Sequence, residues 1–225
     1  MGYRHTAFVP GEWYHCYNRG VDKRTVFETK NDYKRFLETL YLSNSSETGK
    51  RNNLTNQNKH EILTLPRKEP HLVAIGAYCL MPNHFHILLK ELEEGGISKF
   101  MHKVGTSYTM YFNLKNDRTG NLFVKPFRSK HVGTDRYFKH VGHYIHLNSG
   151  DLFESEWKAK APRNIQKLKE RIEKYPYSSL PDYLNIQRPE KAILDETSME
   201  LFRSDVPFPT LLAEAFAYYT EINLP

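Results

Sequence analysis

The sequence predicts an α+β sandwich in which helices pack against a mostly antiparallel sheet. Strand-like segments rich in aromatic and β-branched residues alternate with amphipathic helix-like segments. A short turn containing proline and asparagine joins two of the strands. The expected order is therefore strand, helix, strand, strand, helix, strand, helix. The chain has 225 residues, of which 39% are hydrophobic and 26% charged, as expected for one large globular domain or a domain with an appendage.

The first half of the chain is expected to supply three strands and one helix. Residues 13–21, WYHCYNRGV, predict a strand, and residues 32–42 predict a helix with an apolar face that Asn31 or Asp32 could cap. The polar stretch 43–70 has too little apolar surface to pack, and we expect a long loop there. Two strands forming a hairpin are expected next, at residues 72–80 and 84–92.

The second half is expected to be mainly helical, around one extended segment with a basic edge. The expected elements are a helix at 97–115, the extended segment at 122–132, a helix from near Asp135 to Asn148 capped by Thr134 or Asp135, a polar linker at 149–165, a helix at 165–175, and helices within 190–225 with turns at Pro207 and Pro209. We expect a core at residues 1–152, which includes the 43–70 insertion, and a helical extension at residues 153–225.

Charge and composition favour a polyanionic partner and argue against several protein classes. Lysine and arginine total 32 against 26 acidic residues, which gives a net charge of +6. With 15 tyrosines and 13 phenylalanines, the chain suits single-stranded nucleic acid, whose bases stack on rings and whose phosphates meet cations. Two cysteines cannot build a disulfide framework. We find no signal peptide and no apolar membrane span, and we expect a cytoplasmic protein without a membrane partner.

Two histidines stand on one strand of the expected hairpin. In a strand, residues two apart point to the same face, so His84 and His86 point one way and Phe85 the other. Two neighbouring imidazoles can hold a divalent metal ion. A His-x-His pattern is short, however, and two ordinary histidines are the commoner explanation of it.

A tyrosine and an asparagine stand one helical turn apart further along. Tyr144 and Asn148 share one face of the expected helix. Asn148 could offer an oxygen to a metal, with the Tyr144 phenol beside it. The commoner explanation of such spacing is that Tyr144 is a core residue and Asn148 a C-terminal cap before Ser149 and Gly150.

Several segments together resemble one family. MPNHFHILLK resembles the signature of the HUH single-tyrosine transposases, the IS200-like transposase superfamily, and in particular the branch of REP-associated tyrosine transposases. Further segments, in order, resemble the same branch over residues 13–184: YHCYNRGVDKRTVFET, DYKRFL, GNLFVKPFRSKHV, YIHLN and YPYSSLPDYL. The likeness departs after Asn148, where such sequences often carry proline and this one has Ser149 and Gly150. The 43–70 insertion is also longer than expected.

The resemblance implies a ferredoxin-like, or RRM-like, sandwich and a specific chemistry. Mg²⁺ or Mn²⁺ would be held by His84, His86 and Asn148, and Tyr144 would attack the scissile phosphate to form a 5′-phosphotyrosyl bond. The partner would be hairpin-forming single-stranded DNA, bound by a monomer or homodimer. The basic residues expected to contact DNA are Arg19, Lys23, Arg24, Lys125, Arg128 and Lys130.

The residues alone leave two alternative functions and three alternative candidates for the nucleophilic tyrosine. A non-catalytic module binding single-stranded nucleic acid would not need the metal. A small metal-dependent hydrolase would use the histidines with water and would survive loss of the Tyr144 hydroxyl. Tyr108, Tyr111 and Tyr137 are interpreted as core or DNA-stacking residues, because Phe112 and Lys115 stand one turn after the first two and no amide does. The residues identify no general base.

Overall fold

The computed structural model describes residues 7–45, 62–66, 70–154, 162–201 and 207–222. The strands are β1 (Trp13–Arg19), β2 (Val73–Met81), β3 (His84–Glu91) and β4 (Arg128–Val132). The α-helices are α1 (Lys30–Ser43), α2 (Gly96–Lys115), α3 (Asp135–Leu147), α4 (Ile165–Glu173), α5 (Leu180–Tyr183), α6 (Glu196–Leu201) and α7 (Phe208–Ile222). Short 3₁₀ turns are η1 (Val21–Lys23), η4 (Ile62–Thr64), η5 (Asn148–Leu152) and η6 (Pro189–Ile193).

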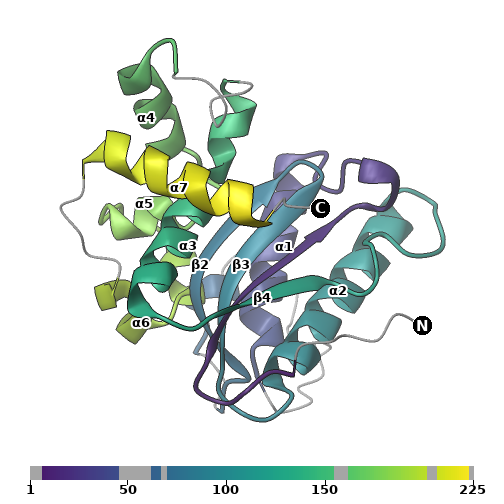
Figure 1. Ribbon diagram of the computed structural model, residues 1–225. Coiled ribbons are helices and arrows are strands. Elements are labelled where there is room, and N and C mark those ends of the chain that lie inside the picture. Colours follow the sequence, from purple (N-terminus) through teal and green to yellow (C-terminus); the bar gives the residue numbers. More distant parts are fainter. Residues whose placement is uncertain (1–6, 46–61, 67–69, 155–161, 202–206, 223–225) are drawn as a thin grey trace.

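The four strands form one antiparallel sheet in the order β2-β3-β1-β4. With the chain order β1, α1, β2, β3, α2, β4, this is the ferredoxin-like arrangement, and it confirms the predicted α+β sandwich. The sheet separates two layers of helices, with α1 and α2 on one side and α3 and α7 on the other (Figure 1).

Strand alternation divides the apolar side chains between two cores. On β3, Phe85 and Ile87 pack in the cluster that includes α1 and α2, whereas Leu88 packs in the cluster that includes α3. The same division applies on β1, where Tyr14 and Cys16 face the α1–α2 layer. A sheet that is covered on both faces needs apolar residues at every position, and β2 is accordingly buried along its whole length.

The chain after α3 packs along the outer edge of the sheet. The Leu80 N–H donates to the Tyr177 carbonyl at 2.9 Å, and the Ser179 N–H donates to the Tyr78 carbonyl at 2.9 Å. The Arg188 guanidinium also contacts the buried Asp182 carboxylate. The two backbone hydrogen bonds to Leu80 and Tyr78 thus add pairing to the edge of β2 that no strand of the sheet covers. No helix within the described ranges has the length and apolar character to cross a membrane.

The structure refines three expectations about elements. The extended segment at 122–132 is regular strand only from Arg128, while Phe123 forms an isolated bridge with Gly20. The cap of α1 is Thr29, in a capping box with Asp32. Pro209 lies in the first turn of α7, where proline is tolerated, and does not form a separate turn. Most of the 43–70 insertion, at 46–61 and 67–69, lies outside the described residues.

A buried ion pair joins α1 to α2. Asp32 is fully buried and accepts from the Lys115 ammonium at 2.8 Å and from the Tyr111 hydroxyl at 2.8 Å. Burial alone would raise the pKa of the Asp32 carboxyl, but these bonds and the N–H groups of Thr29 and Glu28 outweigh it, and the pKa lies below its usual value. The carboxylate is therefore charged at neutral pH and stabilises the folded state there.

We predict that Lys115→Met lowers the free energy of unfolding by about 1–3 kcal/mol at neutral pH, because it leaves the buried Asp32 with fewer donors. A lowered folded pKa stabilises the protein above the unfolded value of about 3.9, and this stabilisation is lost as the pH falls through the folded pKa. The difference from wild type should therefore shrink in acid. Urea unfolding across this pH range measures it. Lys99→Met, which removes an exposed pair with Glu93, is the control, and an equal loss in both variants would contradict the prediction.

Candidate functional site

His84 and His86 lie on the face of β3 that α3 covers. His86 is buried and His84 is half-buried, and their ring centroids are 5.1 Å apart. His84 begins the strand directly after the Pro82–Asn83 turn. The imidazoles therefore stand at one end of the hairpin, between the sheet and the α3 layer.

Strand β1 adds two more rings to the same face. Antiparallel pairing sets Tyr17 opposite His86 and His15 opposite Leu88. The Tyr17 ring stacks on His86 with centroids 5.5 Å apart, and His15 Nε2 lies 2.9 Å from His86 Nδ1. His15 is fully buried, and burial, aided by the charge of Lys130, lowers the pKa of its imidazole to about 3. His15 is therefore neutral at physiological pH.

Helix α3 brings Tyr144 against these rings. The helix begins at Asp135 and is capped by Thr134, whose hydroxyl accepts from the Tyr137 N–H at 3.2 Å, and it then packs across the sheet (Figure 1). The Tyr144 ring meets His86 edge-on with centroids 5.4 Å apart, and it meets His15 at 5.7 Å. The structure thus brings Tyr144 next to His86, although the two residues are far apart in the sequence.

Asn148 ends α3 one turn after Tyr144. It is the C-cap residue of the helix, as one of the two interpretations of the sequence proposed, and it is 1% exposed. Among the described residues, its Oδ1 has no hydrogen-bond partner. A buried carbonyl oxygen without a donor costs free energy, so this oxygen fits a ligand that the protein itself does not supply.

The ring nitrogens indicate how a metal would bind. His84 Nδ1 lies 2.6 Å from Asn83 Oδ1, and His86 Nδ1 faces His15. Each imidazole would therefore use Nε2 toward a metal, while Nδ1 bonds to a neighbouring side chain, as is usual for ligating histidines. Within the described ranges, no three His, Cys, Asp or Glu residues form a metal-binding group. Imidazole nitrogens and an amide oxygen such as Asn148 Oδ1 are donors of the kind that divalent ions take.

The basic residues expected to meet DNA lie around this cluster. Arg19 pairs across the strands with His84, and Arg128 pairs with Tyr17, so both belong to the histidine face of the sheet. Both are exposed. Lys130 shares that face, with its ammonium 5.6 Å from the Tyr137 ring centroid.

The remaining predicted cations lie just beyond the strand ends. Lys23 is exposed in η1, and its carbonyl accepts from Asn83 Nδ2 at 3.3 Å. The Arg24 guanidinium forms an ion pair with Asp22 at 3.4 Å, which engages part of its charge. Lys125 is exposed on the segment that leads into β4.

The rival tyrosines of α2 lie on the opposite side of the sheet. The Tyr108 hydroxyl is buried in the α1–α2 core and donates to the Val26 carbonyl at 2.6 Å. The Tyr111 hydroxyl donates to Asp32. The sheet therefore separates both phenols from the histidines. Tyr137 lies on α3, partly buried against the same cluster as Tyr144.

Two histidines on α3 point elsewhere, as their helical positions predict. His143 Nδ1 lies 2.9 Å from the Glu214 carboxylate of α7. His146 Nε2 lies 2.9 Å from the Ser179 hydroxyl in the extension. Both contacts hold α3 to the segments that cover it.

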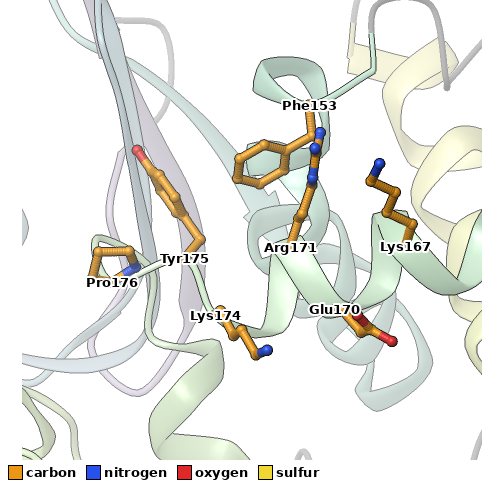
Figure 2. A pocket seen from close by; sticks show the side chains of 7 residues that line it. All are labelled: Phe153, Lys167, Glu170, Arg171, Lys174, Tyr175 and Pro176. Atoms are coloured by element: carbon orange, nitrogen blue, oxygen red, sulfur yellow. The ribbon is translucent and has the colours of Figure 1, made fainter.

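A separate hollow lies beside α4. Figure 2 shows the Arg171 side chain beside the Phe153 ring, with a distance of 5.9 Å from the guanidinium carbon to the ring centroid. The Tyr175 hydroxyl points away from the hollow and donates to the Leu80 carbonyl at 2.7 Å. The lining residues are Phe153, Lys167, Glu170, Arg171, Lys174, Tyr175 and Pro176. The hollow shares no residue with the histidine cluster.

The sequence-based search did not select His15 and Tyr17 as site residues. Their spacing could have indicated them, because in WYHCYNR these two residues are two apart and so share a strand face, as His84 and His86 do. What the sequence did not show is the register that sets β1 beside β3. Only that register identifies the face on which all four side chains meet.

Comparisons with known proteins agree with the fold and give a match to one family model. Residues 50–148 match the family model described as "Transposase IS200 like". Among solved structures, the fold is similar to the REP-associated tyrosine transposase bound to a REP hairpin, with a TM-score of 0.50 and 13% identity. That match covers 84% of this chain and 90% of the other. The search of curated proteins found no significant match.

We predict that Asn148→Leu, a change of similar shape, raises the free energy of unfolding by about 1 kcal/mol in EDTA, because it removes a buried oxygen that lacks a donor. In millimolar Mn²⁺, wild type should gain stability and the variant should gain much less. Thermal unfolding in both buffers measures this. A variant that is less stable than wild type in EDTA would show that Asn148 acts mainly as a helix cap.

Proposed function

We propose that the protein, whose residues 50–148 match the IS200-like transposase model, cleaves and rejoins single-stranded DNA with Tyr144 as the nucleophile and a divalent metal ion as cofactor. The observation that carries the proposal is the meeting of His84, His86 and Tyr144 on one face of the sheet. A transposase needs a nucleophile and a means to stabilise phosphate charge at one place, and this cluster offers both.

The metal would bind through His84 Nε2, His86 Nε2 and Asn148 Oδ1. The support is the engagement of both Nδ1 atoms by neighbouring side chains and the lack of a donor for the buried amide oxygen within the described residues. Two imidazoles favour Mn²⁺ over Mg²⁺, which prefers oxygen ligands. When bound, either ion supplies Lewis-acid polarisation of a phosphate oxygen.

Tyr144 would form the covalent link to DNA. Its phenolic oxygen attacks phosphorus and loses its proton, a P–O bond to tyrosine forms, and the bond to the 3′ oxygen breaks. The product is a 5′-phosphotyrosyl end and a free 3′-hydroxyl, and the reverse reaction rejoins the strand without an external energy source. The edge-on contacts with His86 and His15 hold the ring in a defined place for this step.

The DNA would lie along the histidine face and its rim. Arg19 and Arg128 are exposed there and would contact phosphates, with Lys130 beside them. Lys23, Arg24 and Lys125 would extend this surface. The solved relative is bound to a REP hairpin, and we infer that the partner here is also a hairpin-forming strand. Residues 1–152 would form the catalytic core and residues 153–225 its helical extension.

The test of the nucleophile uses labelled hairpin DNA with Mn²⁺ and a denaturing gel. Wild type should give a covalent adduct, and Tyr144→Phe should give none, because it keeps the ring but lacks the attacking oxygen. DNA affinity should change little. Tyr137→Phe, on the same helix, is the control and should keep the adduct. An adduct formed by Tyr144→Phe would place the nucleophile elsewhere, and Tyr17 would be the next candidate because its ring stacks on His86.

The test of the metal site compares His84→Ala and His86→Ala with His131→Ala. His131 lies on β4, and its Nε2 is 2.8 Å from Glu12. We expect both site variants to lose Mn²⁺ binding in calorimetric titrations and to lose cleavage, because each removes one imidazole ligand. The control should bind as wild type does. Unchanged binding by His86→Ala would remove the histidine pair from the mechanism, and cleavage without metal would favour another chemistry.

A further inference from the structure

His15 is a polar side chain in a fully buried position. It lies in the middle of β1, 0% exposed, between the sheet and the α3 layer. Burying an imidazole in such surroundings costs free energy unless its nitrogens are hydrogen-bonded. An apolar side chain at this position would avoid that cost. The structure shows what the imidazole does instead: its Nε2 lies 2.9 Å from His86 Nδ1.

A hydrogen bond between two imidazoles needs one donor and one acceptor. If His86 is to bind a metal through Nε2, that nitrogen must present its lone pair, and the ring proton must sit on Nδ1. The His86 Nδ1–H then donates to His15 Nε2, and His15 carries its own proton on Nδ1. The direction of this one bond therefore selects the tautomer of His86. Asn83 Oδ1, at 2.6 Å, stands in the same relation to His84 Nδ1.

We propose that His15 is a positioning residue for His86: its Nε2 accepts the His86 Nδ1 proton and thereby holds the ring with Nε2 toward the metal. This inference rests on the proposed function. Partners of this kind fix the orientation and tautomer of ligating histidines, and their loss typically weakens metal binding about 10–100-fold. The Tyr144 ring contacts both imidazoles, so the same bonded pair also orients the surface against which the nucleophile packs.

Two substitutions separate positioning from packing. His15→Gln keeps a hydrogen-bond acceptor near the place of Nε2, whereas His15→Leu fills the space without one. If His15 only fills the core, leucine should serve at least as well as glutamine. If it positions His86, glutamine should retain Mn²⁺ affinity within a few-fold of wild type, and leucine should lose about 10–100-fold. His131→Leu, which removes an exposed histidine of β4, is the matched control and should bind Mn²⁺ as wild type does.

A direct measurement on the metal-free protein completes the test. In ¹⁵N-histidine-labelled wild type, long-range ¹⁵N–¹H spectra should show His86 protonated at Nδ1. His15→Leu should give a mixture of His86 tautomers, and thermal unfolding checks that the variant is folded. A wild-type His86 protonated at Nε2 would overturn the proposal, as would equal Mn²⁺ affinity for the leucine and glutamine variants. Failure of wild type to bind Mn²⁺ would instead contradict the proposed function, while the tautomer still reports on the pair.

Discussion

The pairing of β1 with β3 is the constraint on which the site depends. Antiparallel register places Tyr17 opposite His86, and the alternation of side chains then sends His15, Tyr17, His84 and His86 to one face. A slip of one residue would turn the β1 rings toward the α1–α2 core and leave His86 without its hydrogen-bond partner. The apolar residues between them, which fill the opposite core, oppose such a slip because they would become misplaced as well.

The two faces of the sheet are built for different tasks. On the α1–α2 side, tyrosine hydroxyls and the Asp32 carboxylate are paired with protein donors and acceptors, so that layer is held rigidly. On the α3 side, imidazole, phenol and amide groups are gathered without an acidic residue in the cluster described above. One oxygen on this side, Asn148 Oδ1, lacks a donor among the described residues, and a buried oxygen without a donor is costly for stability. Under the proposed function, binding of a cation would offset that cost.

Local patterns predicted the elements well, and contacts between distant segments were harder to foresee. The hairpin strands and α2 matched expectation within a residue or two, because apolar periodicity and the Pro82 turn are local signals. The placement of Tyr144 beside His86 followed only from the assumption that α3 covers the histidine face. The sequence did not point to His15, because its contact with His86 depends on the register between β1 and β3. The segment YPYSSLPDYL resembled the family, but nothing in it predicted the edge contacts of residues 177–179 with β2, since these involve backbone groups.

Those edge contacts also bear on how the two parts of the chain depend on each other. Strand β2 is the outer strand of the sheet, and the Leu80 N–H and the Tyr78 C=O on its outer edge are bonded to the backbone of Tyr177 and Ser179. Without the extension, these groups would form an open strand edge able to recruit another chain. The Tyr175 hydroxyl donates to the Leu80 carbonyl, one residue before Met81 ends β2 and four residues before His84 begins β3. Residues 175–179 thus take the place of a fifth, irregular strand beside β2. Their contacts restrain the end of the hairpin that carries His84 and His86, although they lie nearly a hundred positions downstream of β2.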